Sequence, residues 1–454
     1  MGIVEKFKNS KFAKTCVNIW KIEDLRTRLL ITVAFCAIYR FGSFIVLPGI
    51  DAEALQGLRT QTEGGLMSLL DMFSGGAFSK ASIFALGIMP YISASIVMQL
   101  LGIAVPYFQK MQREGESGRR KMNQYTRYLT VAILIFQAPG YLYNLRSQTM
   151  GQAIYPSIDW TVFMITSTII LAAGSMFILW LGERITDKGI GNGVSMIIMI
   201  GIIARFPQAI AQEITTKWSS PGQGGLVVFL IEIVIWLAII AAAILLVQGV
   251  RRVPVQYAKR VVGNRQMGGA RQYIPLKVNA ANVMPIIFAQ AIMFIPLTLF
   301  QISGGNSSWI QPFMDHTSWP YNVVFAFLII IFTYFYTAIT LNSTQMAEDM
   351  KRNNGFIPGI KPGKPTADFL DQIMDRITLP GSLLLAVIAV LPAFAGVFGV
   401  KAEFAQFFGG TSLLILVGVV LDTLQQIESH LMMRHYDGLL SSGRIRGRAG
   451  ATAY

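Results

Sequence analysis

The sequence predicts an all-α polytopic membrane protein with ten transmembrane helices in two inverted five-helix halves, and three observations lead to this fold class. Of the 454 residues, 53% are hydrophobic and only 14% are charged. A helix needs about 20 mainly apolar residues to cross a bilayer, and the chain contains many uncharged runs of that length. The density of basic residues also alternates from one connection between these runs to the next.

Ten apolar runs are long enough to cross a bilayer. They lie near residues 25–47, 80–105, 127–145, 159–182, 190–210, 225–249, 282–302, 320–341, 379–400 and 404–427. Five runs fall in an N-terminal half, residues 25–210, and five in a C-terminal half, residues 225–427. Because five is odd, two related halves have opposite orientations in the membrane, which places a pathway at their interface.

The net charge of +14 follows the connections between the spans. Of the 38 Lys and Arg residues, 31 lie in the basic segment 1–24 and the start of the first span, in the connections that follow even-numbered spans, or in the tail 428–454. By the positive-inside rule, both termini are cytoplasmic. The first residues lack the apolar core and cleavage site of a signal peptide and do not resemble a transit peptide, which favours a bacterial plasma membrane over a plastid membrane.

Two of the cytoplasmic connections are longer than insertion into a membrane requires. Residues 250–280 alternate apolar and polar positions around Gly-Asn and Gly-Gly, a pattern typical of a basic hairpin. Residues 342–378 have a Gly/Pro-rich tip followed by a short amphipathic helix. These loops are either solvated segments that stabilise the topology or docking surfaces for a large partner, and spacing alone favours neither interpretation.

Polar chemistry is sparse within the predicted spans. Their ionisable residues are Arg40, Glu232 and Asp422. An ion-coupled transporter of small solutes normally carries intramembrane acids, and a membrane enzyme needs clustered polar residues at one face, so both classes are disfavoured. The two cysteines and three histidines are not spaced as a disulfide framework or a metal site. We therefore expect no catalytic residue, no cofactor and no metal; the charge needs no DNA partner, and a scaffold without transport is a further alternative.

A short apolar stretch precedes the second span and cannot cross a bilayer. It is expected as a helix over about 65–74, with the sequence Ser-Gly-Gly directly after Phe73. The topology places residues 48–78 on the non-cytoplasmic side, where apolar side chains of this helix would meet water. We therefore expect them to be buried in a concave place on that side, or in a re-entrant helix that never moves.

Several motifs follow one another in the order and spacing of the SecY family. They are GGAFSKASIFALGIMPYISASI, REGESGRRKMNQYTRY, WLGERITDKGIGNGVS, VQYAKR, IPLKVNAANVMP, FIPGIKPG and FGGTSLLI. Over nearly its whole length the chain resembles this family, whose members are central subunits of the bacterial protein-conducting channel. The resemblance implies a passage for unfolded secretory polypeptides and a lateral gate, between spans 2–3 and 7–8, that releases hydrophobic segments into lipid. Prolines in these gate spans are expected to weaken helical continuity; they are Pro90, Pro139, Pro285 and Pro296.

The resemblance also implies a ring of aliphatic side chains at the constriction. By motif, its members are Ile88, Ile92, Val194, Ile198, Ile287 and Ile415. Within each of the first two pairs the residues are four apart and share one helix face. An apolar ring gates by dewetting, although each residue taken alone is equally well an ordinary buried aliphatic side chain. Val194 is smaller than the isoleucine usual there.

The remaining expectations also come from the resemblance. The short apolar helix is a plug made of Leu66, Met67, Leu69, Leu70, Met72 and Phe73, and its hinge is Gly75 and Gly76. The ribosome or the SecA motor ATPase docks on Arg251, Arg252, Lys259, Arg260 and Lys361. At 361 the family more commonly has arginine, and lysine keeps the charge without the planar fork. Further partners are SecE- and SecG-like membrane subunits, the translocating polypeptide and membrane lipid.

Overall fold

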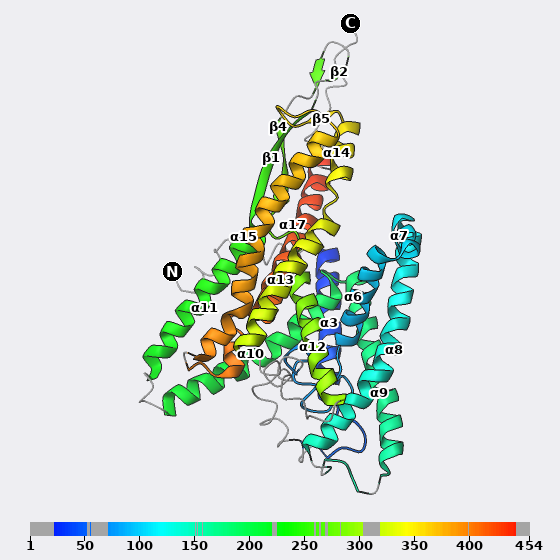
Figure 1. Cartoon of the computed structure of the whole chain (residues 1–454), viewed down its shortest axis with the longest axis vertical. Helices are drawn as coiled ribbons and strands as arrows, with labels where there is room; N and C mark the ends of the chain where they lie inside the picture. The colour runs from blue at the N-terminus through cyan, green and yellow to red at the C-terminus, as the bar shows by residue number, and fades with distance from the viewer. Residues whose placement is uncertain are drawn as a thin grey trace.

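The structure is a computed structural model. It describes residues 22–441 apart from 52–54, 56–70, 150, 152, 157, 220–224, 258–259, 263–264, 268–270, 282, 303–317 and 398. The described part is mostly helical, with helices α3 (Glu23–Gly42), α6 (Met89–Ala104), α7 (Pro106–Arg113), α8 (Glu116–Gln148), α9 (Trp160–Lys188), α10 (Gly193–Ser219), α11 (Gly225–Gln248), α12 (Met284–Ile302), α13 (Trp319–Thr340), α14 (Ser343–Arg352), α15 (Lys364–Val397), α16 (Ala402–Ala405) and α17 (Gly410–Ser441). In Figure 1 the cyan α6 and α8 lie to one side of the yellow-to-red α13, α15 and α17.

The long helices define a multi-pass membrane protein. Among the described residues, six helices are long and apolar enough to cross a membrane: α9, α10, α11, α13, α15 and α17. A seventh span results if α6 and α7, which are bent by 102° at the break between them, are counted together. The predicted spans at 25–47, 127–145 and 282–302 correspond to α3, α8 and α12, so the total of ten stays a prediction.

The second span begins later than its apolar run predicts. Residues 81–88 form turns, and α6 starts only at Met89. The backbone of this stretch is paired elsewhere: Leu47 N donates to Ala81 O at 2.9 Å, and Val46 and Ser82 form an isolated β-bridge. These long-range bonds compete with helix formation, which apolar content alone does not reveal.

The prediction about the gate prolines is wrong for two of them. Pro90 and Pro285 both lie in the first turn of their helices, α6 and α12. A first-turn residue has no helical partner for its N–H, so proline there starts a helix instead of weakening it. Pro139, in contrast, lies inside α8 as expected.

The predicted hairpin over 250–280 is present. Strand β1 (Val250–Tyr257) pairs antiparallel with β4 (Arg271–Lys277), and β2 (Arg260–Val262) pairs with β3 (Arg265–Met267) between them. Strand β5 (Gly355–Phe356), from the other long loop, adds to the free edge of β1 to give the order β4-β1-β5. Figure 1 shows these strands and α14 projecting together from the upper end of the molecule.

The short amphipathic helix expected within residues 342–378 is not a separate element. Its residues are the first part of α15, which continues through Pro380 to Val397. Leu370 and Met374 of this first part pack with Val253 and Val255 of β1 in a small core of their own. The apolar face is thus explained by packing against the hairpin.

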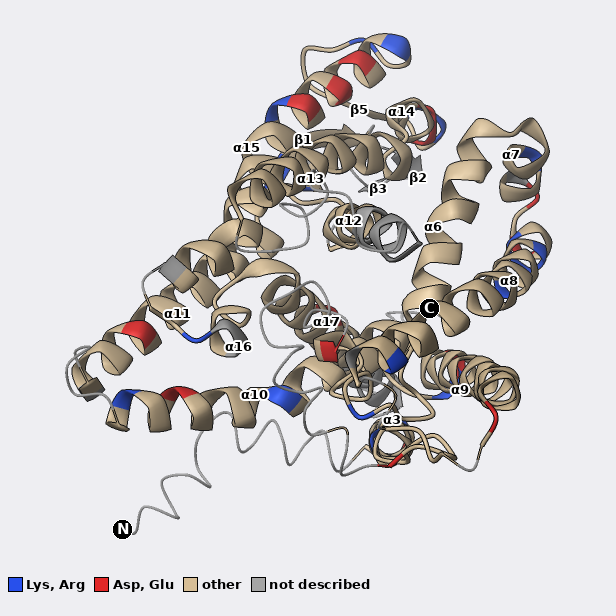
Figure 2. Ribbon diagram, turned by 60° about the horizontal axis from the view of Figure 1, so that its bottom comes forward, with Lys and Arg blue, Asp and Glu red and all other residues tan. Residues whose placement is uncertain are grey.

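Charge is distributed unevenly among the helices. In Figure 2 most Lys, Arg, Asp and Glu residues gather near helix ends, and the middles of the helices are largely free of them. Helix α10 differs, because Arg205, Glu213 and Lys217 follow one another along it. Arg205 and Lys217, which the topology prediction assigned to the non-cytoplasmic connections, lie within this helix, which extends beyond the predicted end at residue 210.

Candidate functional site

The six residues predicted as a ring lie in one hydrophobic cluster, which we call the central cluster. They are Ile88, Ile92, Val194, Ile198, Ile287 and Ile415. Ile88 and Ile198 are each 4% exposed and Ile415 is 2% exposed, whereas the other three are half-buried. Four of the six come from the N-terminal half and two from the C-terminal half, so the cluster lies where the halves meet.

Close helix packing carries Val194 and Ile198 into the central cluster. Both lie in the first turns of α10, one turn apart. A Cβ atom added to Gly193 would clash with Gly182 O of α9, so glycine at this position allows α10 to approach α9 closely. The structure brings all six residues together; their role as a constriction stays a prediction.

The described end of the predicted plug helix joins the same cluster. Residues 71–73 are helical, and Met72 and Phe73 are 2% and 7% exposed. Both belong to the central cluster with Ile88 and Ile198. The other four predicted plug residues lie outside the described residues, and the plug itself stays a prediction; they are Leu66, Met67, Leu69 and Leu70.

The Gly75-Gly76 pair forms a tight turn against α10. The φ angles of Gly75 and Gly76 are +66° and +87°, a region that glycine adopts without strain. Their amides donate to Met72 O at 3.1 Å and to Asp71 O at 2.8 Å. A Cβ atom on Gly75 would lie 3.0 Å from the Cα of Gly201. Conformation and close approach both require glycine at 75, and its role as a hinge stays a prediction.

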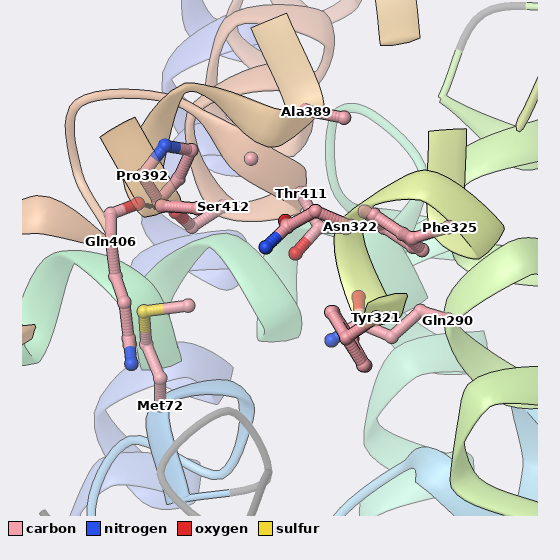
Figure 3. Close-up of a pocket in the computed structure, with 12 residues that line it drawn as sticks. Met72, Gln290, Tyr321, Asn322, Phe325, Ala389, Pro392, Gln406, Thr411 and Ser412 are labelled. Carbon is pink, nitrogen blue, oxygen red and sulfur yellow. Dashed lines mark hydrogen bonds between the residues drawn. The ribbon is translucent and has the colours of Figure 1, made fainter. Parts of the chain in front are cut away.

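A small cavity adjoins the plug segment on the side of the C-terminal half. Its volume of about 40 Å³, counted as the space in which the centre of a water molecule fits, holds roughly three waters. Figure 3 shows Met72 and Gln406 at one side of it and Gln290 and Tyr321 at the other. Met72 is the plug residue in a lining otherwise supplied by the C-terminal half. Plug and C-terminal half therefore meet across van der Waals contacts and a cavity at this point.

The basic residues predicted to dock a partner lie on one protrusion. Arg251 and Arg252 are exposed on β1, and Lys361 is exposed in the turn that follows β5. Because Gln256 of β1 pairs with Phe356 of β5, the two long loops share a sheet and present these cations together. Lys259 lies outside the described residues, as does the side chain of Arg260 in β2.

Sequence reasoning missed two buried sets of charged residues. Asp71 of the plug segment forms an ion pair with Arg205 of α10, and their side chains are 3% and 15% exposed. Lys217 lies 2.9 Å from Glu232 and 3.5 Å from Glu213, all nearly buried. An acid in the short apolar helix and an arginine in a predicted span were the available signals. The spans are thus less free of charge than the sequence indicated.

The fold and these sites define a class of protein: a multi-pass helical membrane protein whose two halves meet at an apolar cluster and which carries a basic protrusion at one end. Within the described ranges, no three His, Cys, Asp or Glu residues are grouped so as to hold a metal ion. A family model described as SecY matches residues 82–424. The chain belongs to the SecY family, whose members are channel subunits and not enzymes.

Curated relatives agree over almost the full chain. The Protein translocase subunit SecY of Streptomyces scabiei is 45% identical over 437 residues, which cover 93% of this chain and 98% of the relative. That of Corynebacterium glutamicum is 43% identical over 442 residues, covering 93% and 99%. That of Chlamydia trachomatis is 38% identical over 455 residues, covering 96% and 99%.

Solved structures share the fold at lower sequence identity. One described as "The structure of a protein conducting channel" has a TM-score of 0.62 at 18% identity, covering 89% of this chain and 92% of that chain. Another concerns the plug domain of the SecY protein, which its description says stabilises the closed state of the channel, and has a TM-score of 0.59 at 18% identity with the same coverage. Sec61 in the canine ribosome-channel complex has a TM-score of 0.56 at 17% identity, again with this coverage.

Proposed function

We propose that this chain forms a conduit that passes unfolded secretory polypeptides across a bacterial plasma membrane and releases hydrophobic segments sideways into lipid. The observation that carries the proposal is the central cluster, in which six aliphatic side chains from both halves converge with Met72 and Phe73. Such a cluster offers no fixed polar partner, so it excludes water and ions while accepting any polypeptide sequence. The ten-span topology with both termini in the cytoplasm is part of this proposal.

The same proposal assigns the resting seal to two layers. The first is the ring of Ile88, Ile92, Val194, Ile198, Ile287 and Ile415. The second is the plug, of which Met72 and Phe73 pack on the ring, with a hinge at Gly75 and Gly76. Burial of Met72 and Phe73 beside Ile88 and Ile198 supports this division.

The basic protrusion is the proposed docking place for the ribosome or the SecA motor ATPase. Arg251, Arg252 and Lys361 are exposed on one sheet, and phosphate-rich or acidic surfaces attract such a cluster. Lys259 and Arg260 belong to the same proposed surface. SecE- and SecG-like subunits are proposed membrane partners on the lipid-facing sides.

Cross-linking of an arrested secretory chain tests the conduit. Single cysteines replace Ile92 and Ile198, both in the central cluster, and Ile203, which is 43% exposed on α10 and serves as the matched control. We expect cross-links from the arrested chain to positions 92 and 198 and none to 203. Equal yields at all three positions, or none at 92 and 198, would contradict passage through the centre of the chain.

A further inference from the structure

The segment Asp71–Ser79, which we call the plug root, is held by polar side chains from two helices of the N-terminal half. Arg205 of α10 pairs with the Asp71 carboxylate and also donates to Ser79 Oγ at 3.3 Å. The other Asp71 oxygen accepts from Ser79 N at 2.8 Å. The carboxylate therefore joins both ends of the plug root to α10.

Helix α3 supplies a second set of contacts to the plug root. Arg40 Nη1 donates to Gly75 O at 2.5 Å, and Tyr39 OH donates to Ser74 O at 3.2 Å. Tyr39 is only 1% exposed, and the Arg40 guanidinium lies 4.8 Å from the centre of the Phe44 ring, which helps to fix its position. Two consecutive carbonyl oxygens of the glycine turn are thus bound by side chains of one helix.

The contacts of the plug root with the other half differ in kind. Toward the C-terminal half, Met72 borders the small cavity with Gln406 and Thr411, and Phe73 lies in the central cluster with Ile415. Apolar contacts of this type separate without leaving a buried charge unpaired, whereas removal of either partner of the Asp71–Arg205 pair leaves one. The polar bonds point to one half and the separable contacts to the other.

From this asymmetry we infer that Arg205, Arg40 and Tyr39 are positioning residues that latch the plug root to the N-terminal half, so that the root moves with α3 and α10 when the two halves separate. This inference rests on the proposed role of the plug. The Gly75-Gly76 turn is then a clamped anchor in the resting channel. Motion of the plug begins on the far side of Asp71, or requires the Asp71–Arg205 pair to break.

The test compares ion leak and amide hydrogen exchange of residues 71–79 in reconstituted channels carrying Arg205→Met, Arg205→Lys or Tyr39→Phe. We expect Arg205→Met to raise the leak about tenfold and to speed exchange at Ser79, whose amide bonds to Asp71. Arg205→Lys keeps the charge and should restore most of the seal. Lys217→Met removes another buried cation from α10 away from the plug root and is the matched control.

The outcomes separate the latch from a general loss of stability and from failure of the plug itself. An equal rise in leak for Lys217→Met and Arg205→Met would overturn the latch. So would unchanged exchange in residues 71–79 of Arg205→Met. If Arg205→Met does not fold, Tyr39→Phe, which loses a single hydroxyl, must speed exchange at residues 74–79 for the latch to stand. Deletion of 66–73 with no rise in leak refutes the plug, whereas a rise there without one in Arg205→Met refutes the latch alone.

Discussion

Lys217 and Glu232 form a buried ion pair of 2.9 Å that joins the end of α10 to the beginning of α11. Glu213 lies one helical turn before Lys217 and accepts a hydrogen bond from Lys401 N at 3.0 Å. Lys217 also donates to Gly399 O at 3.4 Å. The set thus ties the connection between the two proposed halves to the chain that follows α15, and it fixes the axis about which the halves can separate.

Lys217→Met should lower the stability of the folded protein. It leaves Glu213 and Glu232 buried near each other without their cation, and removal of one partner of a buried pair costs about 3–5 kcal/mol. Thermal unfolding in detergent should show a clearly lower midpoint. Lys401→Met, which removes an exposed ammonium from the same region, should leave the midpoint nearly unchanged. A similar loss in both variants would argue against the buried network.

Ile415→Asn should make the resting channel leak. Ile415 is 2% exposed in the central cluster, and an amide there would lower the barrier to water and ions by about 2 kcal/mol, roughly a 30-fold rise in leak. Ion flux through reconstituted vesicles measures this. Val420→Asn places the same amide on α17 at a position that is 40% exposed, and it should not raise the flux. If Ile415→Asn and Ile88→Asn both leave leak and precursor export unchanged, the ring has been assigned to the wrong residues.

Gly201→Ala should displace the plug root without any change of charge. A Cβ atom on Gly201 would lie 2.6 Å from Phe73 O, so the plug root must shift, although alanine favours the helix itself by roughly 0.5–1 kcal/mol. We expect higher leak from a protein that remains folded. Gly140→Ala in α8 has no atom within 4 Å of the added Cβ and is the control. A sealed Gly201→Ala channel would mean that the contact with Phe73 is not needed for closure.

Arg252→Glu should weaken docking of the ribosome or the SecA motor at the basic protrusion. The change reverses an exposed charge on β1 beside the turn that carries Lys361, and we expect about tenfold weaker binding that depends strongly on salt. Binding to vesicles at two salt concentrations measures it. Arg120→Glu makes the same change of charge on exposed α8 and should have a smaller effect. Equal effects would indicate attraction by total charge and not by this protrusion.

Lys361→Arg addresses the departure from the usual family residue. Arginine adds a planar fork that binds carboxylate or phosphate through two hydrogen bonds, so it should tighten docking a few-fold if the contact is direct. The same binding assay measures the change. No change in affinity would place the partner's surface away from Lys361, while leaving docking at Arg251 and Arg252 open to its own test.

The sequence by itself determined the membrane class, the position of most long helices, the hairpin at 250–280 and the family. These features are written in local patterns: apolar runs, alternation around glycine turns, and motifs of consecutive residues. Local pattern also gave the spacing of Ile88 with Ile92 and of Val194 with Ile198, because residues four apart share a helix face. It did not give the start of α6, since the backbone of residues 81–88 is bound by residues 45–47.

The tertiary structure alone decided which distant residues meet. Asp71 and Arg205 are far apart in sequence, and nothing local indicates that each neutralises the other in a buried place. The join between β1 and β5 likewise depends on two loops that leave different helices and reach the same end of the molecule. Burial of charge is favourable only once a partner has been brought within bonding distance, so such pairs follow from the packing of the helices and cannot be read from either segment separately.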